Sequence, residues 1–185
     1  MRFKVAVAAL LCALAQTVAA DVADSAANGF TVKIVTQIHA SPADVYNRLV
    51  HKVGDWWNSA HSFSGDSHNL SIEDRPQGCF CEKLPGGGGL RHLEVVFAAP
   101  GKMLRLSGGL GPLQGMATAG SMTFTFTPAE GGTKLDVTYT VVGYAAQGMT
   151  TWAAPVNMVL TEQITRLKSY IEVGNPAGSP EPQKR

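Results

Sequence analysis

Residues 152–171 read WAAPVNMVLTEQITRLKSYI and carry the pattern that decides the fold. Charged residues separate apolar side chains that recur at helical spacing, namely Trp152, Val156, Val159, Leu160, Leu167 and Ile171. This pattern predicts one long amphipathic helix. Because proline has no backbone N–H to donate, the helix either runs from about Gly148 with a bend at Pro155 or begins near Ala154. Its apolar stripe must be covered, so we expect it to lie against a sheet.

The preceding residues alternate in a way that predicts antiparallel strands. Apolar and polar side chains alternate along residues 30–38 and again along residues 122–127. Glycine-rich turns separate further segments of this kind, and we expect strands at 69–73, 78–84, 90–98, 103–106 and 135–141. Ser41 and Pro42 suit the first positions of a helix, and a second short helix or turn is expected at 54–58.

The order of these elements predicts an α+β fold. A curved antiparallel sheet of about six to seven strands is expected to hold the long C-terminal helix on its concave face. Two short helices follow the first strand. A strongly curved sheet leaves space beneath the helix, and such a space is a natural ligand cavity.

Composition limits the class of protein. The 185 residues are 45% hydrophobic and 16% charged, with a formal net charge of +1. One globular domain is therefore expected rather than a disordered chain, since disorder requires low hydrophobicity and high charge. A nucleic-acid binder that relies on bulk positive charge is not supported.

Both ends of the chain are expected to lie outside the domain at 28–173. Residues 1–20 combine a short basic start, an apolar stretch and small residues up to Ala20, which is typical of a secretory signal peptide. A buried N-terminal helix is the alternative. Residues 21–27 are expected to be a flexible lead-in, and the Pro- and Gly-rich tail 174–185 to be disordered. No apolar run reaches the roughly 18 residues that indicate a transmembrane helix.

The cysteines of the exported chain, Cys79 and Cys81, stand two residues apart and share one face of the strand expected at 78–84. The favoured interpretation is two small buried apolar side chains. A metal or redox role and a disulfide, strained or intermolecular, remain as alternatives.

The strands expected at 78–84 and 90–98 form a hairpin. If its turn is centred near Gly87, the two faces of these strands can be assigned. Cys81 is then expected near Leu93, and Cys79 near Val95, on an apolar inward face. By the same alternation, the side chains expected to meet water are Glu82, His92 and Glu94.

The element order resembles that of the START-like (SRPBCC) superfamily over about residues 30–172. The stretches that carry the resemblance are Ser41–Tyr46, Trp56-Trp57, Gly78–Glu82, Gly108–Leu113 and Leu167–Ile171. The resemblance implies a helix-grip fold. It is strongest to a bacterial branch that groups polyketide cyclases with activators of a heat-shock chaperone ATPase. The superfamily also contains lipid carriers and hormone receptors, so the fold does not specify the function.

The resemblance and the signal peptide together favour a periplasmic or secreted protein, processed near Ala20. A chaperone activator is disfavoured because that partner is intracellular. Asn69-Leu70-Ser71 fits a glycosylation sequon, which matters only on a eukaryotic secretory route.

The common catalytic motifs are missing from the sequence. It has no G-x-S-x-G elbow and no phosphate-binding loop, and residues 86–89 form a turn. His61, Asp66 and His68 could bind zinc or calcium, but their spacing matches no metal motif, so we expect a polar loop near one mouth of the cavity. No pair of carboxylates is expected to face inward. We therefore predict no metal, no cofactor and no catalytic residues.

The candidate ligand-binding residues face the expected cavity. They are Trp57, Phe63, Cys81, Leu93, Phe124, Tyr139, Trp152 and Met158, with Arg91 at the rim. Arg91 could pair with a ligand carboxylate or lie in solvent. Tyr139 could donate a hydrogen bond to the ligand or serve only in packing. Of the adjacent Trp56 and Trp57, one is expected to pack in the core and the other to border the cavity.

These observations favour a non-enzymatic protein that binds a lipid, an aromatic or a polyketide-like molecule. One alternative is a cyclase, dehydratase or hydrolase that uses the same cavity with Arg91, Tyr139 or His61. A second alternative is a module whose groove binds another polypeptide.

Overall fold

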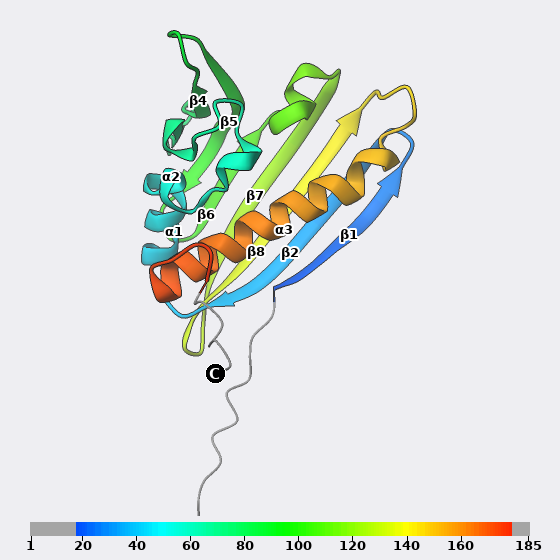
Figure 1. The fold of residues 1–185 in the computed structure, drawn as a ribbon. Helices are drawn as coiled ribbons and strands as arrows, with labels where there is room; N and C mark the ends of the chain where they lie inside the picture. The colour runs from blue at the N-terminus through cyan, green and yellow to red at the C-terminus, as the bar shows by residue number, and fades with distance from the viewer. Residues whose placement is uncertain (1–17, 179–185) are drawn as a thin grey trace, which may run out of the picture.

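A computed structural model describes residues 18–178. Figure 1 shows one antiparallel sheet with the helix α3 running across one of its faces. The strands are β1 (Ala19–Ala26), β2 (Gly29–Ile38), β3 (Leu70–Ile72), β4 (Cys79–Lys83), β5 (Gly89–Ala99), β6 (Met103–Ser107), β7 (Thr118–Ala129) and β8 (Gly132–Gly143). The helices are α1 (Pro42–His51), α2 (Val53–Trp56) and α3 (Thr150–Val173), with short 3-10 turns η1 (Ser59–His61), η2 (Ser67–Asn69) and η3 (Gly111–Gly115).

The α+β class is confirmed, but the sheet has eight strands rather than six to seven, in the order β1-β2-β8-β7-β6-β5-β4-β3. The additional strand is β1. Residues 21–26, expected in a flexible lead-in, pair with β2, with Asp21 opposite Lys33 and Val22 opposite Val32. This prediction was wrong because β1 is an edge strand with mostly exposed side chains, so no apolar alternation marks it.

The expected terminal segments lie partly outside the described residues. Residues 1–17 of the expected signal peptide and residues 179–185 of the expected tail are not described. Ala19 and Ala20 begin β1, so processing after Ala20 would leave residues 21–26 to pair with β2. Among the described residues, no helix combines the length and the apolar character that crossing a bilayer requires.

The helix α3 begins close to the first of the two predicted starts and contains Pro155. Met149 N–H donates to the carbonyl oxygen of Ala27 at 2.8 Å, which ties the start of the helix to the β1–β2 turn. Gly174 ends the helix in the left-handed conformation, with φ of 73° and its N–H on the Tyr170 carbonyl. Leu160, Ile164 and Leu167 lie on the buried side of α3, as the apolar stripe predicts.

A β-bulge in β5 determines which side chains of the β4–β5 hairpin face inward. Phe80 pairs with Leu93 and Cys81 pairs with Arg91, so His92 has no partner on β4. Because one extra residue is inserted, His92 and its neighbour Leu93 are both buried. The predicted pairings of Cys81 with Leu93 and of Cys79 with Val95 are therefore wrong.

The bulge reverses the faces expected for β4. Phe80 and Glu82 are buried on the side of α3, whereas Cys79 and Cys81 alternate with them and are only partly buried. A shift of one residue moves every side chain of a strand to the opposite face. The structure contains a disulfide between Cys79 and Cys81, so the interpretation as two free buried thiols was wrong.

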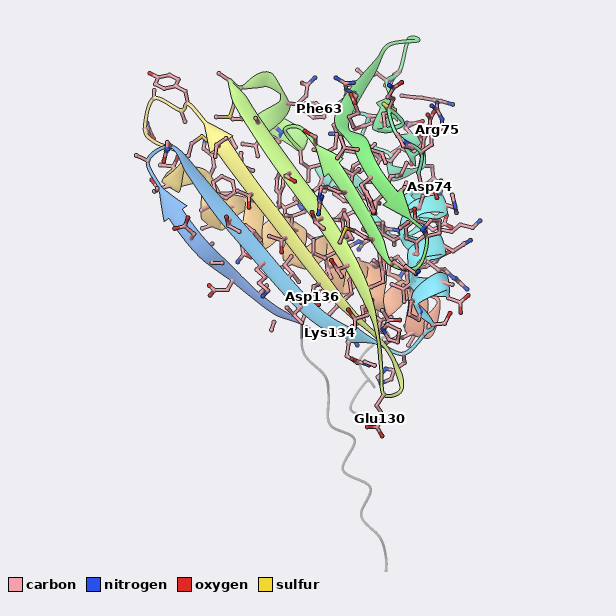
Figure 2. The ribbon with its side chains drawn as sticks, turned by 180° about the vertical axis from the view of Figure 1, so that it is seen from behind. Phe63, Asp74, Arg75, Glu130, Lys134 and Asp136 are labelled. Carbon is pink, nitrogen blue, oxygen red and sulfur yellow. A yellow bond between two sulfur atoms is a disulfide. The ribbon has the colours of Figure 1, made fainter. Side chains whose placement is uncertain are left out.

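The face of the sheet turned away from α3 carries polar side chains (Figure 2). On β8, Lys134 Nζ lies 3.1 Å from Asp136 Oδ2. Thr31 and Thr140 share a hydrogen bond of 3.1 Å between β2 and β8. This face meets water, so a ligand site has to be sought on the side of α3.

Candidate functional site

A cavity of about 310 Å³ lies between α3, β5 and the loops that follow α2 and β6. Its lining is mostly apolar and consists of Trp57, Ala60, His61, Ser62, Phe63, His92, Leu110, Gly111, Pro112, Leu113, Trp152, Pro155, Val156, Val159 and Leu160. Phe63 lies at the end of the sheet away from the β7–β8 turn that carries Glu130 (Figure 2). The polar loop that begins at His61 was expected near one mouth of the cavity, and its residues His61, Ser62 and Phe63 belong to the lining.

Trp57 is the tryptophan that borders this cavity. Its Nε1 donates to the His61 carbonyl at 2.9 Å, and its ring meets Phe80 edge-on with centroids 5.4 Å apart. Trp56 is buried beside it and donates to the Arg48 carbonyl at 3.2 Å. Both indole N–H groups are thus used within the protein, and the Trp57 ring offers the cavity an apolar surface.

Tyr139 holds in place the loop after β6, which forms the cavity wall at Leu110. Its hydroxyl donates to the Gly108 carbonyl at 3.0 Å and accepts from Leu110 N–H at 2.9 Å. Burial raises the pKa of Tyr139 to about 12, so the hydroxyl keeps the proton it donates. A Cβ on Gly120 would approach the Gly108 carbonyl to 2.5 Å and the Tyr139 ring to 2.8 Å, so this contact requires glycine there. Tyr139 positions the wall and does not line the cavity.

A buried pair of polar residues, Glu82 and His92, lies at the β5 side of the cavity. His92 Nε2 is 3.0 Å from Glu82 Oε2, and the two side chains are 3% and 0% exposed. Glu82 also accepts from the backbone N–H groups of Phe63, at 3.1 Å, and Ser64. The prediction that Glu82 and His92 face water was wrong, because the bulge at His92 interrupts the alternation.

This pair links the sheet to the mouth of the cavity. The His92 ring packs against both Phe63 and Phe80, with centroid distances of 6.0 and 5.1 Å. Glu82 anchors the backbone of the loop that carries Phe63, so one carboxylate fixes both the histidine and the mouth residue.

The two groups respond differently to burial. Burial acts to raise the pKa of Glu82, but hydrogen bonds from Ser64, Phe63 and His92 outweigh it and hold that pKa below its ordinary value. Burial lowers the pKa of His92, and the opposing effect of Glu82 does not cancel it. At neutral pH the pair is therefore a carboxylate that accepts a hydrogen bond from a neutral imidazole.

We expect His92 to make the protein less stable in mild acid. In the unfolded chain His92 takes up a proton below about pH 6.5, whereas in the folded protein it resists protonation. The free energy of unfolding therefore decreases as the pH falls from about 6.5 toward the lowered pKa of His92. The slope contributed by this group is at most about 1.4 kcal/mol per pH unit. Glu82 loses its contribution only at lower pH, below about 4.5, since its pKa is also lowered.

Urea unfolding between pH 7.5 and 5.0 measures this slope. His92→Gln keeps an amide N–H for Glu82 but does not titrate, so its unfolding free energy should fall less steeply over this range than that of the wild type. Equal slopes in the two proteins would mean that His92 is not the group responsible.

The helix α3 holds the loop after α2 through two adjacent residues. Glu162 accepts from the Asn58 side chain and lies 3.0 Å from His61 Nε2, and Gln163 accepts from Asn58 N–H at 2.8 Å. The hydrogen bond from Asn58 is the main reason why the pKa of Glu162 is lowered. These contacts connect the helix with the Trp57 side of the cavity.

The residues considered for a metal site do not come together. His61 pairs with Glu162 instead, while Asp66 and His68 bond to each other at 3.1 Å on an exposed loop. Within residues 18–178, no group of three His, Cys, Asp or Glu side chains is placed to hold a metal ion.

The structure brings together some of the candidate ligand-binding residues and separates others. Trp57, Phe63 and Trp152 line the cavity. Leu93 and Phe124 line a neighbouring apolar space of about 20 Å³, beneath the cavity in the core. Four candidates lie outside the lining of both spaces: Tyr139, which positions the wall from behind, and Cys81, Arg91 and Met158.

Each of these exclusions has a physical reason. Cys81 and Arg91 pair across β4 and β5 on the outer face. The Arg91 guanidinium bonds to Glu94 at 2.6 Å and the Arg91 side chain is 61% exposed, so it cannot pair with a ligand carboxylate in the cavity. Met158 is 66% exposed because it lies on the side of α3 turned away from the sheet.

Comparisons with known proteins show the fold. No family model and no curated protein matches the sequence. Among solved structures, a conserved protein of unknown function, EF2215 from Enterococcus faecalis, has a TM-score of 0.58 at 17% identity, covering 93% of this chain and 84% of its own. CalU16 from Micromonospora echinospora has a TM-score of 0.56 at 16% identity, covering 90% and 88%. The Aha1 dimer from Colwellia psychrerythraea has a TM-score of 0.52 at 19% identity, covering 79% and 97%.

These neighbours fit a helix-grip fold. They are consistent with the START-like resemblance found in the sequence, but at such identities the likeness concerns the fold and not the activity. The function has to be argued from the cavity.

Proposed function

We propose that this protein binds an apolar small molecule, preferably an aromatic one, in the cavity between α3 and the sheet. The observation that carries the proposal is a cavity of about 310 Å³ with two tryptophans, Trp57 and Trp152, in its wall. Small-molecule sites range from about 300 to 1,000 Å³ and are lined mainly by apolar and aromatic side chains.

The volume favours a compact ligand. An apolar cavity of about 150 Å³ is enough to bind benzene, so a cavity about twice as large suits a molecule of roughly two fused rings. A lipid with two long chains would require the walls to move apart. Among the lipid, aromatic and polyketide-like candidates, the cavity therefore favours an aromatic molecule or a short polyketide-like one.

A periplasmic or secreted location is part of the proposal. The signal-peptide pattern of residues 1–20 supports it. The disulfide between Cys79 and Cys81 also supports it, since such bonds persist mainly in oxidising compartments.

Naphthalene is a suitable probe for testing this function. In an NMR titration we expect saturable one-to-one binding that shifts the indole signals of Trp57 and Trp152. Signals of Lys134 and Thr140, on the outer face of the sheet, should not move. Native mass spectrometry of the protein purified from its own host would identify a retained ligand. A protein that is isolated empty and does not bind naphthalene saturably would contradict the proposal.

A further inference from the structure

We propose that the ligand of this cavity carries a hydroxyl group, as in a phenol, and that this group donates a hydrogen bond to Nδ1 of His92. The inference rests on the proposed function and specifies the chemical class of its ligand. It follows from the state of one buried ring nitrogen.

The hydrogen bonds around Glu82 assign the tautomer of His92. Glu82 receives backbone N–H groups from Phe63 and Ser64 together with His92 Nε2. A carboxylate only accepts, so Nε2 must carry the proton that is shared with it. In a neutral imidazole the other nitrogen, Nδ1, is then an acceptor with a free lone pair.

Nδ1 of His92 has no hydrogen-bonding partner within the described part of the chain, although it is buried. Buried acceptors are nearly always paired, and leaving one unpaired costs free energy. The ring packs against Phe63 and Phe80, and its other nitrogen bonds to Glu82, so a turn of the ring toward a different partner would break existing contacts.

The position of His92 connects this nitrogen with the ligand. Within residues 18–178, three buried side-chain atoms have no hydrogen-bonding partner, and they belong to His92, Asn157 and Gln163. Of these three residues, His92 is the one that lines the larger cavity. The β-bulge that turns His92 inward is a feature that often re-aims a side chain at a functional site. A ligand hydroxyl in the cavity would supply the missing donor.

The surrounding charges disfavour an acidic ligand. Glu82 already brings a carboxylate to this wall, and His61, the other titratable residue of the lining, is paired with Glu162. Arg91, which could have neutralised a ligand carboxylate, points to the outer face. A neutral donor therefore fits the site, and a second carboxylate does not.

The test compares 2-naphthol with 2-methoxynaphthalene and 2-naphthoate at pH 7.5, by calorimetry on the whole protein. The methoxy compound keeps the rings and the oxygen but cannot donate. We expect 2-naphthol to bind about 10-fold more tightly than the methoxy compound and the carboxylate to bind most weakly. Equal affinities for 2-naphthol and the methoxy compound, or a preference for the carboxylate, would overturn the inference.

Two variants locate the effect. His92→Lys keeps a donor for Glu82 and offers no acceptor to a ligand hydroxyl, so the ratio of the two affinities should fall to about one. The control is Arg91→Gln, one residue away on the outer face, which should keep the ratio of the wild type. If His92→Lys keeps that ratio, the hydroxyl is bound elsewhere.

An NMR measurement on the wild type covers the case in which His92→Lys fails to fold. The ¹⁵N signal of His92 Nδ1 should shift when 2-naphthol binds and should shift much less with the methoxy compound. The two proposals fail in different ways. If naphthalene binds but 2-naphthol shows no preference, only the hydroxyl inference is wrong, whereas failure of all these probes to bind overturns the cavity function itself.

Discussion

Replacing Glu82 with alanine is expected to lower the free energy of unfolding by about 3–5 kcal/mol, because it leaves several buried donors without an acceptor. The backbone N–H groups of Phe63 and Ser64 and the His92 ring all bond to this carboxylate. The side chain is 0% exposed, so water cannot replace it without opening the loop. The loss should therefore be accompanied by release of the loop that carries Phe63.

Urea denaturation gives the change in unfolding free energy, and backbone amide exchange of Phe63 and Ser64 reports the loop. The matched control is Glu94→Ala, which removes a partly exposed glutamate from the other strand of the same hairpin. Its ion pair with Arg91 is 2.6 Å long but largely in solvent, so the loss should stay near or below 1 kcal/mol. A Glu82→Ala protein as stable as Glu94→Ala would show that Glu82 does not hold the loop.

The long helix and most strands could be predicted because their signals are repetitive. Apolar residues at helical spacing mark α3 over several turns, and the alternation in residues 122–127 marks the middle of β7. Such patterns survive small errors at the ends of an element. The start of α3 is an example, because the helix contains Pro155 as its sixth residue and still begins near Gly148, the first of the two predicted starts.

The candidate site was predicted less well because the β4–β5 hairpin contains a bulge. A strict period of two predicted that the cysteines face the cavity and that Glu82 and His92 face water. One unpaired residue in β5 reversed both assignments. A bulge leaves no regular mark in a single sequence. The sequence did contain one hint. Under strict alternation Phe80 shares a face with Glu82, so the assignment of Glu82 to water also placed a large aromatic side chain in water.

The strand β1 was missed for a different reason. Its side chains are mostly exposed, and its pairing with β2 depends on backbone hydrogen bonds rather than on an apolar face. Tyr139 illustrates a third limit. Its inward direction was predicted, but its bonds to Gly108 and Leu110 depend on a loop conformation that local sequence does not specify.

Replacing Val159 with tryptophan is expected to weaken naphthalene binding by roughly 100-fold, since the new indole would occupy the space intended for the ligand. Val159 lines the cavity from α3, opposite the wall that contains His92. The residue is only partly buried, so the larger side chain can enter the cavity without displacing core residues, and the loss of stability should not exceed about 1–3 kcal/mol.

The adjacent residue offers a control on the same turn of the helix. Met158 is 66% exposed and lies outside the cavity, so Met158→Trp should bind naphthalene within about twofold of the wild type. Both variants add the same side chain to α3, so a general effect of tryptophan on the helix would affect them alike. If Met158→Trp lost binding while Val159→Trp kept it, the ligand would bind on the outer side of α3 and the cavity would not be the site.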